Sequence, residues 1–144
     1  MTETKTFNPS INEEMANKEL ERFMDTMGLD YDTEDLDVED LKDFENKKKR
    51  LIKAICKRDL VINEKGEPVY TPKRGDYKDP LTFYEPSGRT MLAFDKRSNK
   101  EQVGQSYELL ASITKTHAAL FTKMNLSDLK ICHTIASLFL AELT

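Results

Sequence analysis

The chain has 144 residues, of which 38% are hydrophobic and 33% charged, and its formal net charge is -4. A chain of this length fits one domain of ordinary size, and the composition is that of a charge-rich protein with a modest core. No stretch approaches the roughly 20 apolar residues that cross a bilayer, and the first residues lack the order of a secretory signal. We therefore expect neither a membrane-spanning nor a secreted protein.

The net charge conceals two blocks of opposite sign. Residues 13–45 carry 14 acidic and 3 basic side chains, whereas residues 46–100 carry 15 basic and 7 acidic ones. Such blocks are typical of solvated faces that pair locally, and they also occur where an acidic segment shields a basic surface that binds nucleic acid. The negative net charge argues against a dedicated nucleic-acid-binding domain, which is usually basic overall.

The first predicted element is an amphipathic helix. Residues 1–9 are polar and are expected to form a flexible lead. Ser10 and Glu13 match a capping box, an apolar stripe with helical spacing follows, and Gly28 is suited to the end of the helix. Methionines of this stripe either fill the core or line a permissive surface for a partner: Met15, Met24 and Met27.

An acidic linker is predicted over residues 29–36, and a second helix from a cap at Asp37 to about Arg58. Acidic residues begin this helix and basic residues end it, as the helix dipole favours. The linker does not match a calcium loop, because a loop that started at Asp30 would have Asp35 where a glycine is needed.

Lys47, Lys48, Lys49 and Arg50 form one basic cluster within the second helix. Four neighbours on a helix fan around more than half of its circumference, and no aromatic residues alternate with them for base stacking. Pairing with the acids of residues 30–45 accounts for the cluster, and contact with nucleic acid is the alternative.

After the second helix the pattern changes from helical to extended. Residues 60–63 and 68–71 flank a turn that contains Gly66, which predicts a β-hairpin. A second hairpin is predicted over residues 81–94, where a Pro-Ser-Gly turn separates two β-rich runs.

The remaining residues predict two or three helices. Ser98 and Glu101 match a capping box for a helix that ends near Thr114, and a short helix is predicted over residues 118–121. Ser127 is the predicted cap of a last helix, whose wide apolar stripe reaches the end of the chain.

The predicted fold is therefore α+β, with N-terminal helices, two β-hairpins that form a small antiparallel sheet, and C-terminal helices that pack on it. Residues 1–36 are predicted to hold the flexible lead, the amphipathic helix and the acidic linker. Residues 37–144 are predicted to form a single α+β domain.

The sequence offers no motif for catalysis, cofactor binding or metal binding. His117 and His133 lie in separate helical segments without the spacing of metal ligands, and the glycines are scattered. Cys132 precedes His133, but neighbouring residues on a helix point about 100° apart, so adjacency does not make them a catalytic pair. We expect a protein that is not an enzyme and has no cofactor, with Cys56 and Cys132 as reduced thiols in apolar surroundings.

Residues 50–143 carry a recognisable order of motifs. A helical run at residues 51–55 precedes the hairpin of residues 59–71 and the segment of residues 81–86, and the chain ends with Leu109-Leu110-Ala111, Leu120, Leu126, Asp128 and a final helix from Ile131 to Leu143. This order resembles the tail assembly chaperones of long-tailed bacteriophages. The preceding acidic section has no counterpart in the resemblance.

The resemblance implies a non-enzymatic protein of the host cytoplasm that coats the tape-measure protein and recruits tail-tube subunits without entering the mature virion. It also implies a frameshifted longer form. A coat of amphipathic helices would hide the apolar surface of the tape-measure protein until the tube encloses it. We expect partner contacts from helix faces, and self-association stays open; the expected contact residues are Met24, Met27, Phe139 and Leu143.

The alternative is a small regulatory or nucleic-acid-associated binding protein that uses the cluster from Lys47 to Arg50. Its binding would weaken steeply with salt, whereas an apolar chaperone contact would be largely salt-tolerant. An enzyme would need a carboxylate pair from the acidic segment, and nothing in the sequence fixes such a pair.

Overall fold

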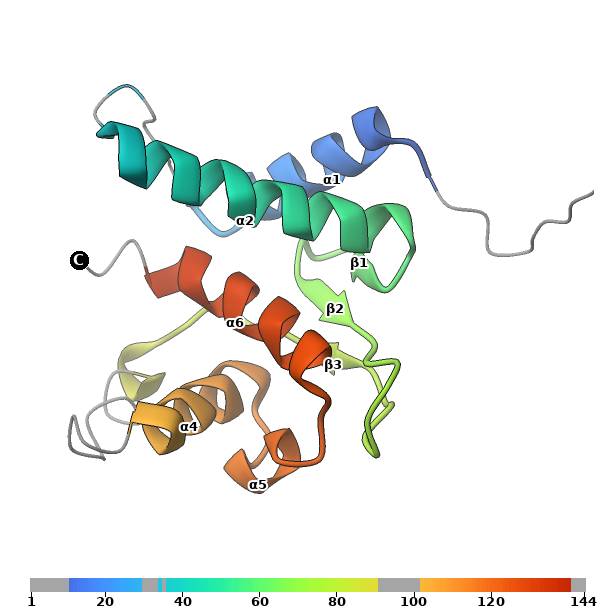
Figure 1. Ribbon diagram of the computed structural model, residues 1–144, viewed down its shortest axis with the longest axis vertical. Helices are drawn as coiled ribbons and strands as arrows, with labels where there is room; N and C mark the ends of the chain where they lie inside the picture. Colours follow the sequence, from blue (N-terminus) through green and yellow to red (C-terminus); the bar gives the residue numbers. More distant parts are fainter. Residues whose placement is uncertain (1–10, 30–33, 35, 91–101, 141–144) are drawn as a thin grey trace, which may run out of the picture.

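The computed structural model describes residues 11–29, 34, 36–90 and 102–140, and its fold is α+β (Figure 1). Two helices precede a three-stranded antiparallel sheet, and further helices follow it. The labelled elements in chain order are α1 (Glu13–Thr26), α2 (Val38–Cys56), β1 (Leu60–Ile62), β2 (Pro68–Tyr70), β3 (Leu81–Thr82), α4 (Gln102–Thr114), α5 (Ala118–Phe121) and α6 (Leu126–Leu140). The predicted flexible lead lies outside the described residues.

Side-chain caps begin both N-terminal helices. Asp37 accepts a 2.8 Å hydrogen bond from the backbone N–H of Asp40, which confirms the predicted start of α2. In α1 the cap is Asn12, whose side chain accepts a 2.8 Å bond from the N–H of Met15. The predicted cap Ser10 lies outside the described residues, and the start of α1 at Asn12 corrects it. Asparagine caps a helix as well as serine does. The N–H of Ile11, just before the cap, donates to the backbone carbonyl oxygen of Cys56 in α2.

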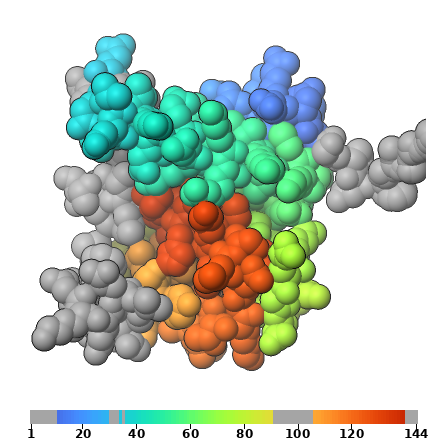
Figure 2. Space-filling view, in the orientation of Figure 1, coloured from blue at the N-terminus to red at the C-terminus, as the bar shows by residue number. Residues whose placement is uncertain are grey.

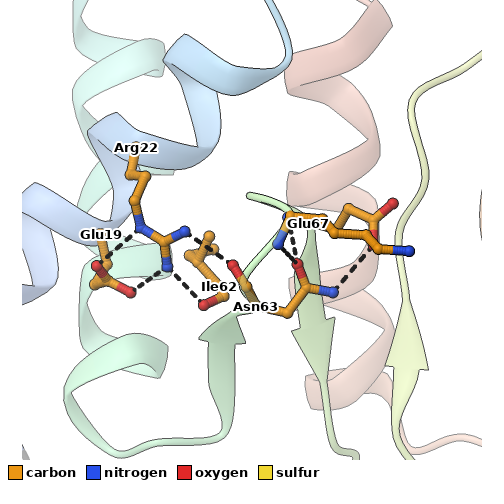
Figure 3. A network of polar contacts seen from close by, with 6 residues as sticks. Glu19, Arg22, Ile62, Asn63 and Glu67 are labelled. Atoms are coloured by element: carbon orange, nitrogen blue, oxygen red, sulfur yellow. Dashed lines mark hydrogen bonds and ion pairs between the residues drawn. The ribbon is translucent and has the colours of Figure 1, made fainter.

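Arg22 attaches α1 to the first hairpin (Figure 3). Its guanidinium donates to the backbone carbonyls of Ile62 at 2.7 Å and Asn63 at 2.8 Å, and it pairs with Glu19 at 2.8 Å. The Asn63 side chain closes the β1–β2 turn by accepting 2.9 Å bonds from the N–H groups of Lys65 and Glu67. Arg22 therefore links α1 to the end of β1, beside the buried contacts of Ala16, Leu20 and Phe23.

The first predicted hairpin is confirmed. β1 pairs with β2 in antiparallel register, with Leu60 opposite Tyr70 and Ile62 opposite Pro68. β3 pairs with the other edge of β2, and Leu81 of β3 lies opposite Tyr70. The strand order is therefore β1-β2-β3.

The second hairpin, predicted over residues 81–94, does not form among the described residues. Its first strand is present as β3, but residues 88–90 form a helical turn where the prediction placed the end of a β-turn and the first residue of the return strand. Ser87 favours this turn, because its hydroxyl accepts a bond from the N–H of Arg89 and its own N–H donates to the hydroxyl of Thr90. Residues 91–94, the rest of the predicted strand, lie outside the described residues.

The core lies among the helices α1, α2, α4, α5 and α6 and the sheet. Phe23 of α1 meets Phe139 of α6 edge-on, with ring centroids 5.5 Å apart. Burying each large apolar side chain stabilises the fold by about 1.5 to 3 kcal/mol. The largest fully buried apolar side chains include Phe23, Leu51, Leu60, Phe83, Phe121 and Ile135.

α6 lies between α2 and α4 and contacts both (Figure 1). The predicted ends of the preceding helices agree with α4 and α5, while Ser98 lies outside the described residues. The predicted cap of the last helix is wrong by two residues. Asn125 supplies it, because its side-chain oxygen accepts 2.9 Å bonds from both the N–H and the hydroxyl of Ser127.

Candidate functional site

The helix residues expected to contact a partner lie largely inside the molecule. Phe139 and Met27 are buried in the core, and Met24 is partly buried against it. Leu143 lies outside the described residues. The stripe of α6 is buried because this helix is covered by α2 on one side and α4 on the other. Of the expected contact residues, Phe139 and Met27 are therefore not exposed to a partner in this structure.

The four consecutive bases of the second helix separate in the structure. Lys47 pairs with Asp43 at 3.2 Å, and Lys48 lies over the ring of Phe44 at 5.7 Å. Arg50 turns toward α6 and donates a 3.0 Å hydrogen bond to the hydroxyl of Thr134. The four side chains therefore do not form one basic surface. Their helical spacing predicts this separation.

An apolar groove of about 650 Å³ lies between α4 and the first turns of α6. We call it the apolar groove; Tyr107, Leu126 and Leu129 supply its apolar lining. Leu126 is 80% exposed although it is a large aliphatic residue. The exposure follows from its place as the first residue of α6, beside the cap of Asn125. An exposed leucine beside an apolar depression is typical of a protein-binding surface.

His133 and Cys132 face different surroundings. The His133 ring lines the apolar groove and lies 3.0 Å from the hydroxyl of Ser106. Partial burial lowers the pKa of His133 below its ordinary value. Cys132 is fully buried, and burial raises the pKa of its thiol. The two side chains are neighbours in sequence but do not form one reactive site.

A second depression, of about 280 Å³, is lined by basic side chains from two parts of the chain. α2 contributes two of them, its C-cap residue contributes a third, and the segment after β2 contributes two. Figure 2 shows α2, this segment and α6 meeting on one face. We call this depression the basic cleft; its basic residues are Arg50, Lys53, Lys57, Lys73 and Arg74.

A buried carboxylate lies at the base of the basic cleft. Asp128 is 2% exposed and accepts a 2.6 Å hydrogen bond from the hydroxyl of Tyr70. Its oxygens also accept bonds of 3.1 to 3.3 Å from the backbone N–H groups of Lys73 and Arg74. Burial and the bond to Asp128 raise the pKa of Tyr70, so its hydroxyl remains a donor at neutral pH.

Gly75 brings the basic segment close to the start of α6. A Cβ at this position would lie 2.5 Å from the backbone carbonyl oxygen of Lys123. The next residue, Asp76, donates its N–H to that same oxygen at 2.9 Å. Only glycine permits this approach, so the segment that carries Lys73 and Arg74 is fixed at both ends.

Sequence reasoning did not identify the basic cleft. Part of the signal was present, because Arg50, Lys53 and Lys57 are separated by three and four residues and thus share one face of a helix. Lys73 and Arg74 join them only through the sheet and the contact with Asp128.

Across the described ranges, no three His, Cys, Asp or Glu side chains lie close enough to share a metal ion. Within the same residues, no helix combines the length and apolarity needed to span a bilayer. Besides the apolar groove and the basic cleft, the described part of the chain has a depression of about 470 Å³ lined by Glu13, Lys49, Ile52, Lys53 and Cys56, and one of about 80 Å³ beside β1. No protein-family model, curated protein or solved structure matches the chain.

Proposed function

We propose that this protein is a non-enzymatic assembly chaperone that binds the tape-measure protein of a long-tailed bacteriophage and helps to recruit tail-tube subunits. It acts in the host cytoplasm and does not enter the mature virion. The observation that carries the proposal is the apolar groove with its exposed Leu126, in a chain whose residues 50–143 resemble the tail assembly chaperones.

The apolar groove suits one face of an amphipathic helix. Such a helix places apolar side chains every three or four residues, and a groove between two helices accepts them. Leu126 and Tyr107 offer apolar contact, while Lys130 supplies a polar edge. A long helical client would present many such faces in succession. Weak contacts repeated along it coat it through avidity, and no energy source is required.

The test is affinity purification of the tagged protein from its native host cells, followed by mass spectrometry. Recovery of the tape-measure protein together with a tail-tube subunit supports the proposal. Recovery of the protein alone, or with nucleic acid, contradicts it.

Two matched substitutions assign the contact to the apolar groove. Leu126→Asp places a charge in the groove, whereas Val38→Asp changes an equally exposed aliphatic residue, 83% exposed, at the start of α2. We expect Leu126→Asp to reduce recovery of the tape-measure protein about ten-fold, because an apolar contact does not tolerate a charge. Val38→Asp should leave recovery unchanged. Equal recovery with both variants would place the contact elsewhere.

A further inference from the structure

The basic cleft retains positive charge that the protein itself does not neutralise. Asp59, the carboxylate at its rim, pairs with Lys73 at 3.3 Å. Asp128 is buried, and both of its oxygens already accept hydrogen bonds. Arg50 donates to the hydroxyl of Thr134 in α6. The remaining basic side chains of the cleft form no ion pair within the described residues: Lys53, Lys57 and Arg74. Among the described residues, the cleft is thus lined by five basic side chains and two carboxylates, which leaves a formal excess of three positive charges.

These cations are positioned before any ligand arrives. Lys53 lies in the last turn of α2, and Lys57 is the C-cap of the helix, four residues further on the same face. The backbone of Arg74 is held by Asp128 on one side and by the close approach of Gly75 on the other. Because the backbone positions of these residues are fixed, binding orders only their side chains, and a ligand with matching negative charge loses less entropy than it would on a mobile loop.

We infer that the basic cleft binds an acidic segment of polypeptide, with Asp or Glu carboxylates placed between α2 and the segment that carries Lys73 and Arg74. The cleft volume of about 280 Å³ admits side-chain carboxylates. Lysine and arginine form charge-assisted hydrogen bonds with such groups, which are stronger than bonds between neutral partners. This inference is independent of the chaperone proposal, which concerns the apolar groove.

The lining of the basic cleft favours a peptide over nucleic acid. Its aromatic residue is Tyr70, which is 4% exposed and donates its hydroxyl to Asp128, so it offers no face on which a base can stack. The first half of α2 carries Glu39, Asp40 and Asp43. An extended polyphosphate that ran along this helix would meet these acids, whereas a short acidic peptide can end before them.

The chain itself supplies a suitable probe. Residues 30–43 contain eight acidic residues and one lysine. A fluorescently labelled synthetic peptide of this sequence is titrated with the full-length protein at low salt, and binding is followed by anisotropy. A second peptide, with every Asp and Glu replaced by Asn and Gln, tests whether the charge is needed. A single-stranded oligonucleotide of the same length tests the competing ligand class.

Charge-neutral variants assign the binding to the basic cleft. The double variant Lys53→Gln, Lys57→Gln removes two cleft cations that face solvent, and Lys65→Gln, Lys78→Gln removes two exposed cations elsewhere. The net charge changes equally in both. We expect the cleft variant to bind the acidic peptide about ten-fold more weakly and the control variant less than about two-fold more weakly. Circular dichroism of both variants verifies that α2 is intact.

Three results would overturn the inference: equal binding of the acidic and the amide peptide, equal loss in the two double variants, or tighter binding of the oligonucleotide than of the acidic peptide. The last result would assign the cleft to nucleic acid. Leu126 lines the apolar groove and not the basic cleft, so loss of the tape-measure protein with normal peptide binding in Leu126→Asp separates the two proposals.

Discussion

The hydroxyl of Tyr70 donates a 2.6 Å hydrogen bond to the buried carboxylate of Asp128. The bond joins the central strand of the sheet to the first turn of α6, across 58 residues of sequence. The same carboxylate receives the backbone N–H groups of Lys73 and Arg74. One buried acid therefore determines both how α6 meets the sheet and where the basic cleft lies.

Substitution of Tyr70 by Phe tests this contact without changing the ring. We expect Tyr70→Phe to lower the free energy of unfolding by about 1 to 3 kcal/mol, because it leaves a buried carboxylate with one donor fewer. Urea denaturation measures the change. Tyr84→Phe is the control, since no described residue bonds to the Tyr84 hydroxyl and its effect should stay within about 0.5 kcal/mol. Equal effects of the two substitutions would show that the bond to Asp128 contributes nothing.

The turn between β1 and β2 depends on the absence of a side chain at Gly66. This residue has φ of +78°, and a Cβ there would lie 2.5 Å from the side chain of Thr26 in α1. We expect Gly66→Ala to cost about 1 kcal/mol for the left-handed backbone and a further 1 to 3 kcal/mol for the clash. Gly28→Ala, at φ of +70° with no neighbour within 4 Å, should show only the first cost. Chemical denaturation of both variants decides, and equal costs would contradict the contact with Thr26.

The two cysteines differ in their access to solvent. Cys56 is partly exposed near the end of α2, whereas Cys132 is fully buried and burial raises the pKa of its thiol. Only the thiolate reacts, so we expect a thiol-specific reagent to label one cysteine of the native protein at least about a hundred-fold faster than the other. Cys56→Ser should remove the fast phase, and Cys132→Ser should preserve it. Two fast phases in the native protein would contradict the burial of Cys132.

The helices and the first hairpin could be predicted because local sequence determines them. Asp37 caps α2 as predicted, and the turn with Gly66 joins β1 to β2. The second hairpin could not be predicted correctly, because Ser87 can close either a β-turn or the first turn of a helix.

The candidate surfaces were harder to predict than the fold. An apolar helical stripe has the same sequence whether the core or a partner covers it, so Met27 and Phe139 were expected at a contact but lie in the core. The predicted basic cluster was the consecutive run from Lys47 to Arg50, whereas the cleft also uses Lys53 and Lys57, which are spaced one helical turn apart. Tertiary structure alone joins these lysines to Arg74.

His133 should make the stability of the fold depend on pH. Partial burial lowers its folded-state pKa below the ordinary value of 6.5, so the unfolded chain binds a proton first as the pH falls. The stabilising contribution is present above about pH 6.5 and decreases as the pH falls toward the lower folded-state pKa. We expect His133→Gln to lose less thermal stability than the wild type between about pH 8 and pH 5. Exposed His117 provides the control, because His117→Gln should retain the pH dependence of the wild type. If His133→Gln follows the wild-type curve as well, the burial of His133 in the apolar groove does not contribute to folding stability.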